Sequence, residues 1–375
     1  MTTTPSLEVL ENLIATIIAP AASEVDRTGS FPRASIDALL GAGFGGLISA
    51  VDVGGAGAGF ADAAQVIRKL GATCASTAMV LTMHLCGTAA IEAFGDTDTR
   101  RAIANGDHLT TLAFSEKGSR SHFWATMSTA TAVDDSDVSL DAEKSWVTSA
   151  GEANSYVWTS RPLAVDAAST LWMVPATTPG LRVAAAFDGL GLRGNASSPV
   201  QAESARVPRS NMLGADGAGL DVALGTVLPW FQVLNAACSL GICDAAIAKA
   251  GEHLTSARLE HLDQSLAEQP LPRYRFGRMK ITADAAGALV DDACVALSNG
   301  RSDAPLRMLQ SKAVAAEAAL TVTDEAMRIG GGAAFRHDIG IERHFRDARA
   351  ASVMAPTTDA LHDMIGRALC GLPLL

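Results

Sequence analysis

The chain has 375 residues and a formal net charge of −11, with 48% hydrophobic and only 5% aromatic residues. This length allows two or three structural domains, and the low aromatic content predicts a core made mostly of Ala, Leu, Val and Ile. The negative charge, without a long run of Lys or Arg, argues against binding to nucleic acid or to an anionic membrane surface.

The six cysteines show neither a CxxC pair nor a metal-ligand spacing, which is typical of reduced and mostly buried thiols in a cytosolic protein. The short apolar run at residues 14–20 has no basic segment before it, so no signal peptide is predicted. No uninterrupted apolar stretch reaches the length of a membrane span. We therefore expect a cytoplasmic protein without a membrane anchor.

Residues 1–110 are predicted to form an N-terminal helical domain. Apolar residues recur at three- and four-residue spacing over residues 7–26. Residues 28–47 place a proline near a helix start and glycines where the helix stops. After a glycine-rich loop, residues 60–95 have the pattern of a long apolar helix pair.

Residues 111–212 change character, because short β-rich runs alternate with Asp, Gly and Pro signals. They predict a small β-barrel or sandwich between two helical domains. Residues 214–219 form a glycine-rich hinge, and residues 220–254 predict a long helix despite Pro229. Further helical patterns complete a C-terminal four-helix bundle over residues 213–375. The expected fold class is α+β and mainly helical.

A glycine turn and a proline turn lie between the last helical patterns. Gly331 and Gly332 permit close approach of a ligand or partner to the backbone, or else serve packing alone. The segment Met354-Ala-Pro-Thr-Thr-Asp359 offers Thr357, Thr358 or Asp359 to cap the following helix. Loops of this kind can hold an anionic cofactor.

This C-terminal segment resembles the end of the acyl-CoA dehydrogenase superfamily. Arg328 takes the place of the Gln in the family's Gln-x-x-Gly-Gly turn, and Gly331 and Gly332 match its glycine pair. Residues 346–348 match its Arg-Asp-Ala run, and residues 354–357 fall on its Tyr-Glu-Gly-Thr turn. The resemblance implies that Arg328, Gly331, Gly332 and Thr357 contact FAD. It also places Ala355 where most members carry the catalytic glutamate.

Two segments of the β region carry the same resemblance. Residues 113–121 are similar to the family's Thr-Glu-Pro-Gly-Ala-Gly-Ser-Asp stretch, which implies flavin contacts by Ser115 and Ser121. Residues 143–148, Glu-Lys-Ser-Trp-Val-Thr, are similar to Glu-Lys-x-Trp-Ile-Thr. An indole offers a flat face to a flavin ring and a hydroxyl can donate to it, so Trp146 and Thr148 are expected at the cofactor.

Arg258 falls near the family's Arg-x-x-Phe-Gly segment, which reaches the FAD of a neighbouring subunit. The Phe-Gly pair does not follow Arg258; Arg273, Phe276 and Gly277 fit the pattern literally but lie further along the chain. The turn at residues 189–194 resembles a strand-joining turn and is given a structural role.

The resemblance leaves the catalytic base open. In desaturation a carboxylate removes the α-proton of the thioester, which Ala355 cannot do. Some members of the superfamily carry this carboxylate on the first helix of the C-terminal bundle instead. That position falls near Phe231, where no carboxylate is present either. His84 and His122 are the candidate bases, since imidazole accepts protons near neutral pH. The alternative for His84 is a buried structural residue. Asp359 is expected to be an N-cap.

The resemblance covers essentially the whole chain and implies a homo-oligomer, a dimer or tetramer, that binds FAD. The first expected function is oxidation of an acyl-CoA or a related small molecule with a non-standard base, passing electrons to an acceptor flavoprotein or O2. The alternatives are a reduced-flavin and O2-dependent monooxygenase, with FMN as cofactor, and a catalytically degenerate flavin-binding protein. No metal site is expected.

Overall fold

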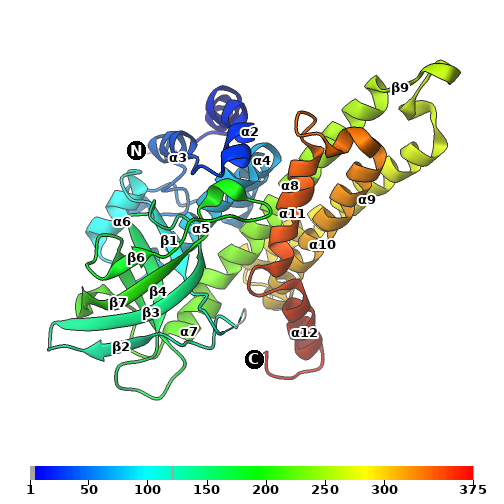
Figure 1. Cartoon of the computed structure of the whole chain (residues 1–375). Helices are drawn as coiled ribbons and strands as arrows, with labels where there is room; N and C mark the ends of the chain where they lie inside the picture. Colours follow the sequence, from blue (N-terminus) through cyan, green and yellow to red (C-terminus); the bar gives the residue numbers. More distant parts are fainter. Residues whose placement is uncertain (1–4, 120–121, 375) are drawn as a thin grey trace. The chain divides into compact units, whose positions relative to one another are not determined.

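The computed structural model describes residues 5–119 and 122–374 (Figure 1). The chain divides into two compact units. The first contains the described parts of Met1–Ala63, Met79–Asp188 and Arg193–Phe231, and the second contains those of Ala64–Ala78, Gly189–Leu192 and Gln232–Leu375.

The N-terminal part is helical, as predicted. Its helices are α1 (Leu7–Leu13), α2 (Ala19–Thr28), α3 (Arg33–Gly41), α4 (Phe60–Thr73), α5 (Ala75–Phe94) and α6 (Thr97–Ala104). The side chain of Ser6 caps α1 by accepting from the Val9 N–H. A π-helical segment, Ile14–Ile18, joins α1 to α2 just before Pro20. Proline cannot donate the regular helical hydrogen bond, so the helix continues through a wider turn.

The middle of the first unit holds two four-stranded sheets. Their strands are β1 (Thr110–Ala113), β2 (Thr129–Ala132), β3 (Asp137–Val147), β4 (Ser155–Ser160), β5 (Thr170–Pro175), β6 (Leu181–Val183), β7 (Ser198–Pro208) and β8 (Met212–Leu213). One sheet has the order β1-β4-β5-β8 and the other β2-β3-β7-β6. Strands β1 and β4 pair in parallel, whereas the other neighbours in both sheets are antiparallel.

The predicted long helix through Pro229 is present in three consecutive pieces. Helix α7 (Gly219–Val222) leads into a π-helical segment, Ala223–Val227, and then into α8 (Leu228–Ser256). The wider turn again comes directly before a proline, as it does before Pro20. The same cause applies, since Pro229 has no N–H to donate to the preceding turn.

The second unit is helical apart from a short hairpin, β9 (Arg258–Leu259) with β10 (Gln264–Ser265). Its main helices after α8 are α9 (Pro270–Ser298), α10 (Ala304–Gly330), α11 (Ile341–Val353) and α12 (Thr358–Leu369). The turn at Gly189–Leu192 also belongs to this unit. A Cβ on Gly191 would lie 2.5 Å from the carbonyl oxygen of Arg346, so glycine permits this close approach to α11. The expected α+β, mainly helical fold is confirmed.

One expectation about hydropathy was wrong. Helix α5 and the stretch Gly219–Ser256 are long and apolar enough to cross a membrane by length and composition alone. Their apolar windows are 78% and 83% buried inside the protein. This burial is the pattern of core helices, in which apolar side chains pack against protein. The six cysteines are all described and free, and only Cys370 is exposed.

Candidate functional site

Trp146 projects from an irregularity at the end of β3. The pairing of β3 with β7 shifts register between Lys144 and Val147. Within this shift Trp146 adopts φ 56°, a region that bulky residues rarely occupy. Its side chain is 70% exposed. Strained backbone of this kind is concentrated at functional sites, and here it holds a large aromatic face outside the core.

A buried ion pair joins β3 to the segment that follows β1. Lys144 pairs with Glu116, and the two side chains are 0% and 3% exposed. The Lys144 Nζ also donates to the carbonyl and hydroxyl oxygens of Thr159, both at 2.7 Å. The Glu116 carboxylate accepts from the Ser128 N–H at 2.8 Å and from the Ser128 hydroxyl. A buried charge pair needs such additional hydrogen bonds to offset its loss of hydration.

The pKa shifts describe a pair held in its charged form at neutral pH. Burial acts to raise the pKa of Glu116, but the charge and hydrogen bond of Lys144, with further hydrogen bonds, bring it below its usual value. Burial lowers the pKa of Lys144 to about 8, although Glu116 opposes this shift. The pair therefore anchors the strand segment that presents Trp146.

The structure brings three of the predicted cofactor residues together at this end of β3. The Ser115 carbonyl accepts from the Ser145 N–H at 2.9 Å, which places Ser115 beside Trp146. Thr148 is buried, and its hydroxyl lies 3.1 Å from that of Ser197. Ser121 lies outside the described residues. We therefore define Ser115, Trp146 and Thr148 as the β3 site.

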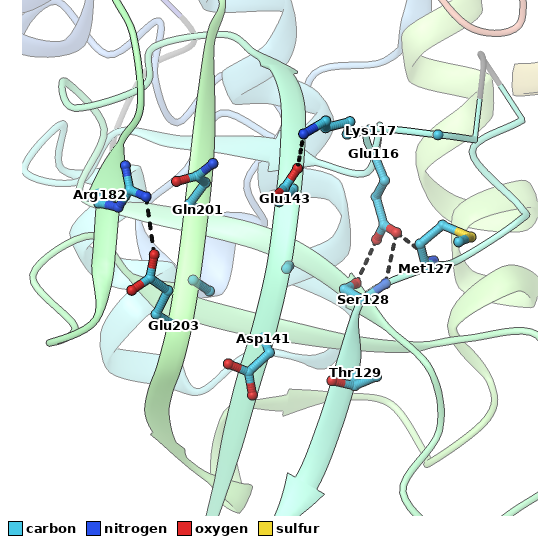
Figure 2. Close-up of a pocket in the computed structure, with 13 residues that line it drawn as sticks. Glu116, Lys117, Met127, Ser128, Thr129, Asp141, Glu143, Arg182, Gln201 and Glu203 are labelled. Atoms are coloured by element: carbon cyan, nitrogen blue, oxygen red, sulfur yellow. Dashed lines mark hydrogen bonds and ion pairs between the residues drawn. The ribbon is translucent and has the colours of Figure 1, made fainter.

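A separate pocket of about 630 Å³ lies on the sheet β2-β3-β7-β6 (Figure 2). Figure 2 shows Glu116 directed toward Ser128 and Met127, while Glu143 points to Lys117. The described residues that line this pocket include neither Trp146 nor Thr148. The pocket is therefore distinct from the β3 site.

In the second unit, the predicted glycine turn follows α10 directly. Gly331 has φ 52° and ψ −134°, a conformation that favours glycine. A Cβ on Gly331 or Gly332 would meet no described atom within 4 Å. Packing against described residues therefore does not require these glycines, and the space beside them is open. Arg328 is exposed and pairs with Asp324 at 2.7 Å.

The proline turn ends in a cap on α12. The Thr357 hydroxyl accepts from the Ala360 N–H at 3.2 Å, so Thr357 is the N-cap. The expectation that Asp359 caps this helix was wrong, since Asp359 is exposed in its first turn. Thr357 thus has a structural role, and a cofactor contact by this residue stays a prediction.

The structure places Arg258 on the β9–β10 hairpin, where it pairs with Asp263. Arg273, the alternative match, lies in the first turn of α9 and donates to the Ala267 carbonyl at 2.9 Å. Both arginines lie at the same end of the second unit, so the pattern alone does not choose between them.

His84 is a structural residue, and its prediction as a catalytic base is corrected. It is 0% exposed, its Nε2 donates to the Gly45 carbonyl at 3.0 Å and its Nδ1 accepts from the Thr110 N–H at 3.1 Å. Both ring nitrogens are therefore committed to the backbone. Burial lowers the pKa of His84 to about 4. His122 is exposed, and its Nδ1 lies 2.9 Å from the Ser119 carbonyl.

Replacement of His84 by Phe is expected to destabilise the protein by at least about 1–3 kcal/mol, because it leaves buried backbone groups without partners. The folded pKa of about 4 lies below the unfolded value of 6.5. The unfolded state therefore binds more protons between these values, and His84 makes stability fall as pH drops from 6.5 to 4. Denaturant unfolding across this range checks both effects. Unchanged stability with lost activity would restore the catalytic interpretation.

Three domain families of known proteins match this chain, in the same order as its helical, β and helical regions. The family described as "Acyl-CoA dehydrogenase, N-terminal domain" matches residues 7–105, the middle domain matches 111–205 and the C-terminal domain matches 217–370. The chain is 28% identical over 348 residues to the short-chain specific acyl-CoA dehydrogenase of Homo sapiens mitochondria, covering 91% of this chain and 83% of that protein.

Two solved structures share the fold over nearly their whole length. Butyryl-CoA dehydrogenase from Megasphaera elsdenii has a TM-score of 0.91 at 24% identity, with 97% of each chain covered. FMN-bound TdsC from Paenibacillus sp. A11-2 has a TM-score of 0.87 at 20% identity, with 98% of each chain covered. With all three family domains matched in order, the chain belongs to the acyl-CoA dehydrogenase superfamily of flavin oxidoreductases.

Proposed function

We propose that this protein is an FAD-dependent oxidoreductase that oxidises an acyl-CoA or a related small molecule without the usual carboxylate base. The observation that carries the proposal is Trp146, which a buried ion pair supports and a strained backbone holds 70% exposed. An exposed indole in this arrangement has a ligand-binding geometry rather than a packing role.

The described residues fit a flavin. The Trp146 indole supplies a stacking face, and the Thr148 hydroxyl, next to Ser197, supplies a hydrogen-bonding group. The Gly331–Gly332 turn offers open backbone to an anionic group. When bound, a flavin accepts a hydride from the substrate. The protein's part is to orient the ring and to accept a substrate proton, which His122 is the remaining candidate to do.

Replacement of Trp146 by Ala is expected to weaken FAD binding by about 1–3 kcal/mol, by analogy with the stacking of a base on an aromatic side chain. Titration of the apoprotein with FAD measures this change. Phe94 is a suitable control, because it is an aromatic side chain 43% exposed on α5. Its replacement by Ala should leave FAD affinity unchanged. Equal affinities for wild type and the Trp146 variant would remove Trp146 from the site.

A reduced-flavin and O2-dependent monooxygenase is the second candidate, because such chemistry needs no carboxylate at Ala355 or Phe231. The shared fold with FMN-bound TdsC is compatible with it. Anaerobic reduction of the protein's flavin by a substrate supports the oxidation function. Reduction only by a separate flavin reductase, followed by O2 consumption, supports the monooxygenase. A purified protein that binds no flavin would contradict both and favour a degenerate family member.

We further propose that the protein works as a cytoplasmic homo-oligomer, with a flavoprotein or O2 as electron acceptor. Helix α9 supports assembly, since Tyr274, Ile281 and Val295 recur on it at multiples of seven residues. These side chains are 63%, 71% and 50% exposed in the single chain. A periodic exposed apolar stripe on a helix is typical of a surface that another helix covers.

A further inference from the structure

Several buried amide and hydroxyl atoms in the second unit have no hydrogen-bond partner among the described residues. Among them are both polar atoms of the Gln232 side chain, the Asn235 Oδ1 and the Thr358 hydroxyl. Gln232 and Asn235 are 0% exposed, and Thr358 is 7% exposed. Leaving such atoms unpaired is costly, so native proteins generally satisfy them with water or a ligand.

Asn235 lies beside the turn that contains Ala355. The Asn235 Nδ2 donates to the Met354 sulfur at 3.2 Å. Gln232 lies three residues earlier on α8, so the two side chains share one face of the helix. Thr358 follows Ala355 by three residues and begins α12. Unpaired polar atoms therefore occur on α8, which contacts this turn through Asn235, and at the start of α12, which follows the turn in the sequence.

Lys312 fixes the same turn from α10. Its buried Nζ donates to the carbonyls of Ala351, Met354 and Pro356, at 2.9, 3.0 and 2.8 Å. An ammonium has three protons, and these three bonds use them. Lys312 therefore positions the turn through these three backbone carbonyls.

We propose that Gln232 and Asn235 form a subsite that binds an uncharged substrate group able to both donate and accept hydrogen bonds, such as a carboxamide or a hydroxyl. The Gln232 amide offers donors and an acceptor, and the Asn235 Oδ1 offers a further acceptor. A carboxylate would face these acceptor oxygens without a donor of its own, and an ammonium would leave the Gln232 donors unpaired. The inference rests on the proposed function, because it assigns a substrate class to the same enzyme.

The subsite is tested with three probes of one size, butyramide, butyrate and butylamine, titrated into FAD-loaded wild type and followed by flavin absorbance and by thermal shift. Butyramide should bind about tenfold more tightly than the two charged probes, as one added hydrogen bond allows. The variants Gln232→Met and Asn235→Leu should each reduce that preference, and Gln310→Leu, on a half-buried glutamine of α10, should leave it intact.

The melting temperature and the FAD affinity of the variants separate a substrate subsite from a structural role and from a flavin contact. The Gln232→Met variant should melt at the same or a higher temperature without probe, because both polar atoms of its buried amide are unpaired and an apolar group removes their desolvation cost. A lower melting temperature would show a structural role and overturn the proposal, as would equal binding of the three probes. Weaker FAD binding by the variants would assign the amides to the flavin instead. If the protein binds no FAD, the proposed function fails, and thermal shift of the apoprotein still tests the subsite.

Discussion

Replacement of Glu116 by Gln is expected to lower the free energy of unfolding by about 3–5 kcal/mol, because it leaves the Lys144 ammonium buried without its counter-charge. Lys144 is 0% exposed on its side chain, and its remaining partners are hydroxyl and carbonyl oxygens. Urea unfolding at neutral pH measures the change. FAD affinity should fall with it, because the pair anchors the strand that presents Trp146.

The neighbouring pair Lys117–Glu143 provides a matched control. Its charged atoms lie 2.7 Å apart, but the side chains are 76% and 51% exposed. Replacement of Glu143 by Gln should change stability by no more than about 1 kcal/mol, since water screens the interaction. Both pairs join the Glu116–Lys117 segment to β3, but the Lys117–Glu143 pair is far more exposed to water. Similar losses for the two variants would contradict the assigned role of the buried pair.

The pH dependence gives an independent check on Glu116. Its pKa in the folded protein lies below the unfolded value of 4.5. Its contribution to stability is therefore fully present above that value and is lost as pH falls through the folded pKa. The difference in unfolding free energy between wild type and the Glu116→Gln variant should accordingly shrink below pH 4.5. A difference that stays constant in acid would show that the carboxylate charge is not responsible.

Replacement of Ala355 by Glu is expected to raise the rate of butyryl-CoA oxidation by about 10²–10⁴-fold, the usual contribution of a positioned general base. The resemblance places this residue where most members carry their glutamate, and Lys312 holds the surrounding turn. Steady-state assays with an artificial electron acceptor measure the change.

Two companion variants make the Ala355 test specific. Ala355→Gln has nearly the same size as the glutamate but no basic carboxylate, and it should give no gain. The double variant Ala355→Glu/Pro356→Gly restores the family's glycine and allows the new side chain another direction. If the glutamate and glutamine variants are equally active, the missing base does not limit turnover of this substrate.

Local patterns in the sequence were sufficient to predict most of the architecture. Apolar spacing located the helices, including the one that continues through Pro229, because helix period depends on neighbouring residues alone. The alternating short runs between Asp, Gly and Pro located the sheets. The motif at residues 143–148 indicated Trp146 and Thr148, and the structure places Ser115 beside Ser145, the neighbour of Trp146.

Features that depend on contacts between distant residues were not predicted. The Glu116–Lys144 pair joins two motifs that lie 28 residues apart in the chain, and the bridge between their backbones brings them together. The sequence around His84 is compatible with a catalytic base and with a core residue. Its hydrogen bonds to the backbone groups of Gly45 and Thr110 indicate the core residue. Gln232 and Asn235 lie in an apolar helical pattern, so nothing local indicated that the Gln232 amide and the Asn235 Oδ1 lack partners.

Anaerobic mixing of FAD-loaded wild type with butyryl-CoA tests whether this flavin oxidoreductase lacks the usual carboxylate base. Flavin absorbance should persist, decaying about 10²–10⁴-fold more slowly than in the Ala355→Glu variant, as expected without a general base. Dithionite should then bleach the same sample, which shows that the flavin is competent. Bleaching of the wild type by butyryl-CoA as fast as in the Ala355→Glu variant would show that the wild type already holds an effective base.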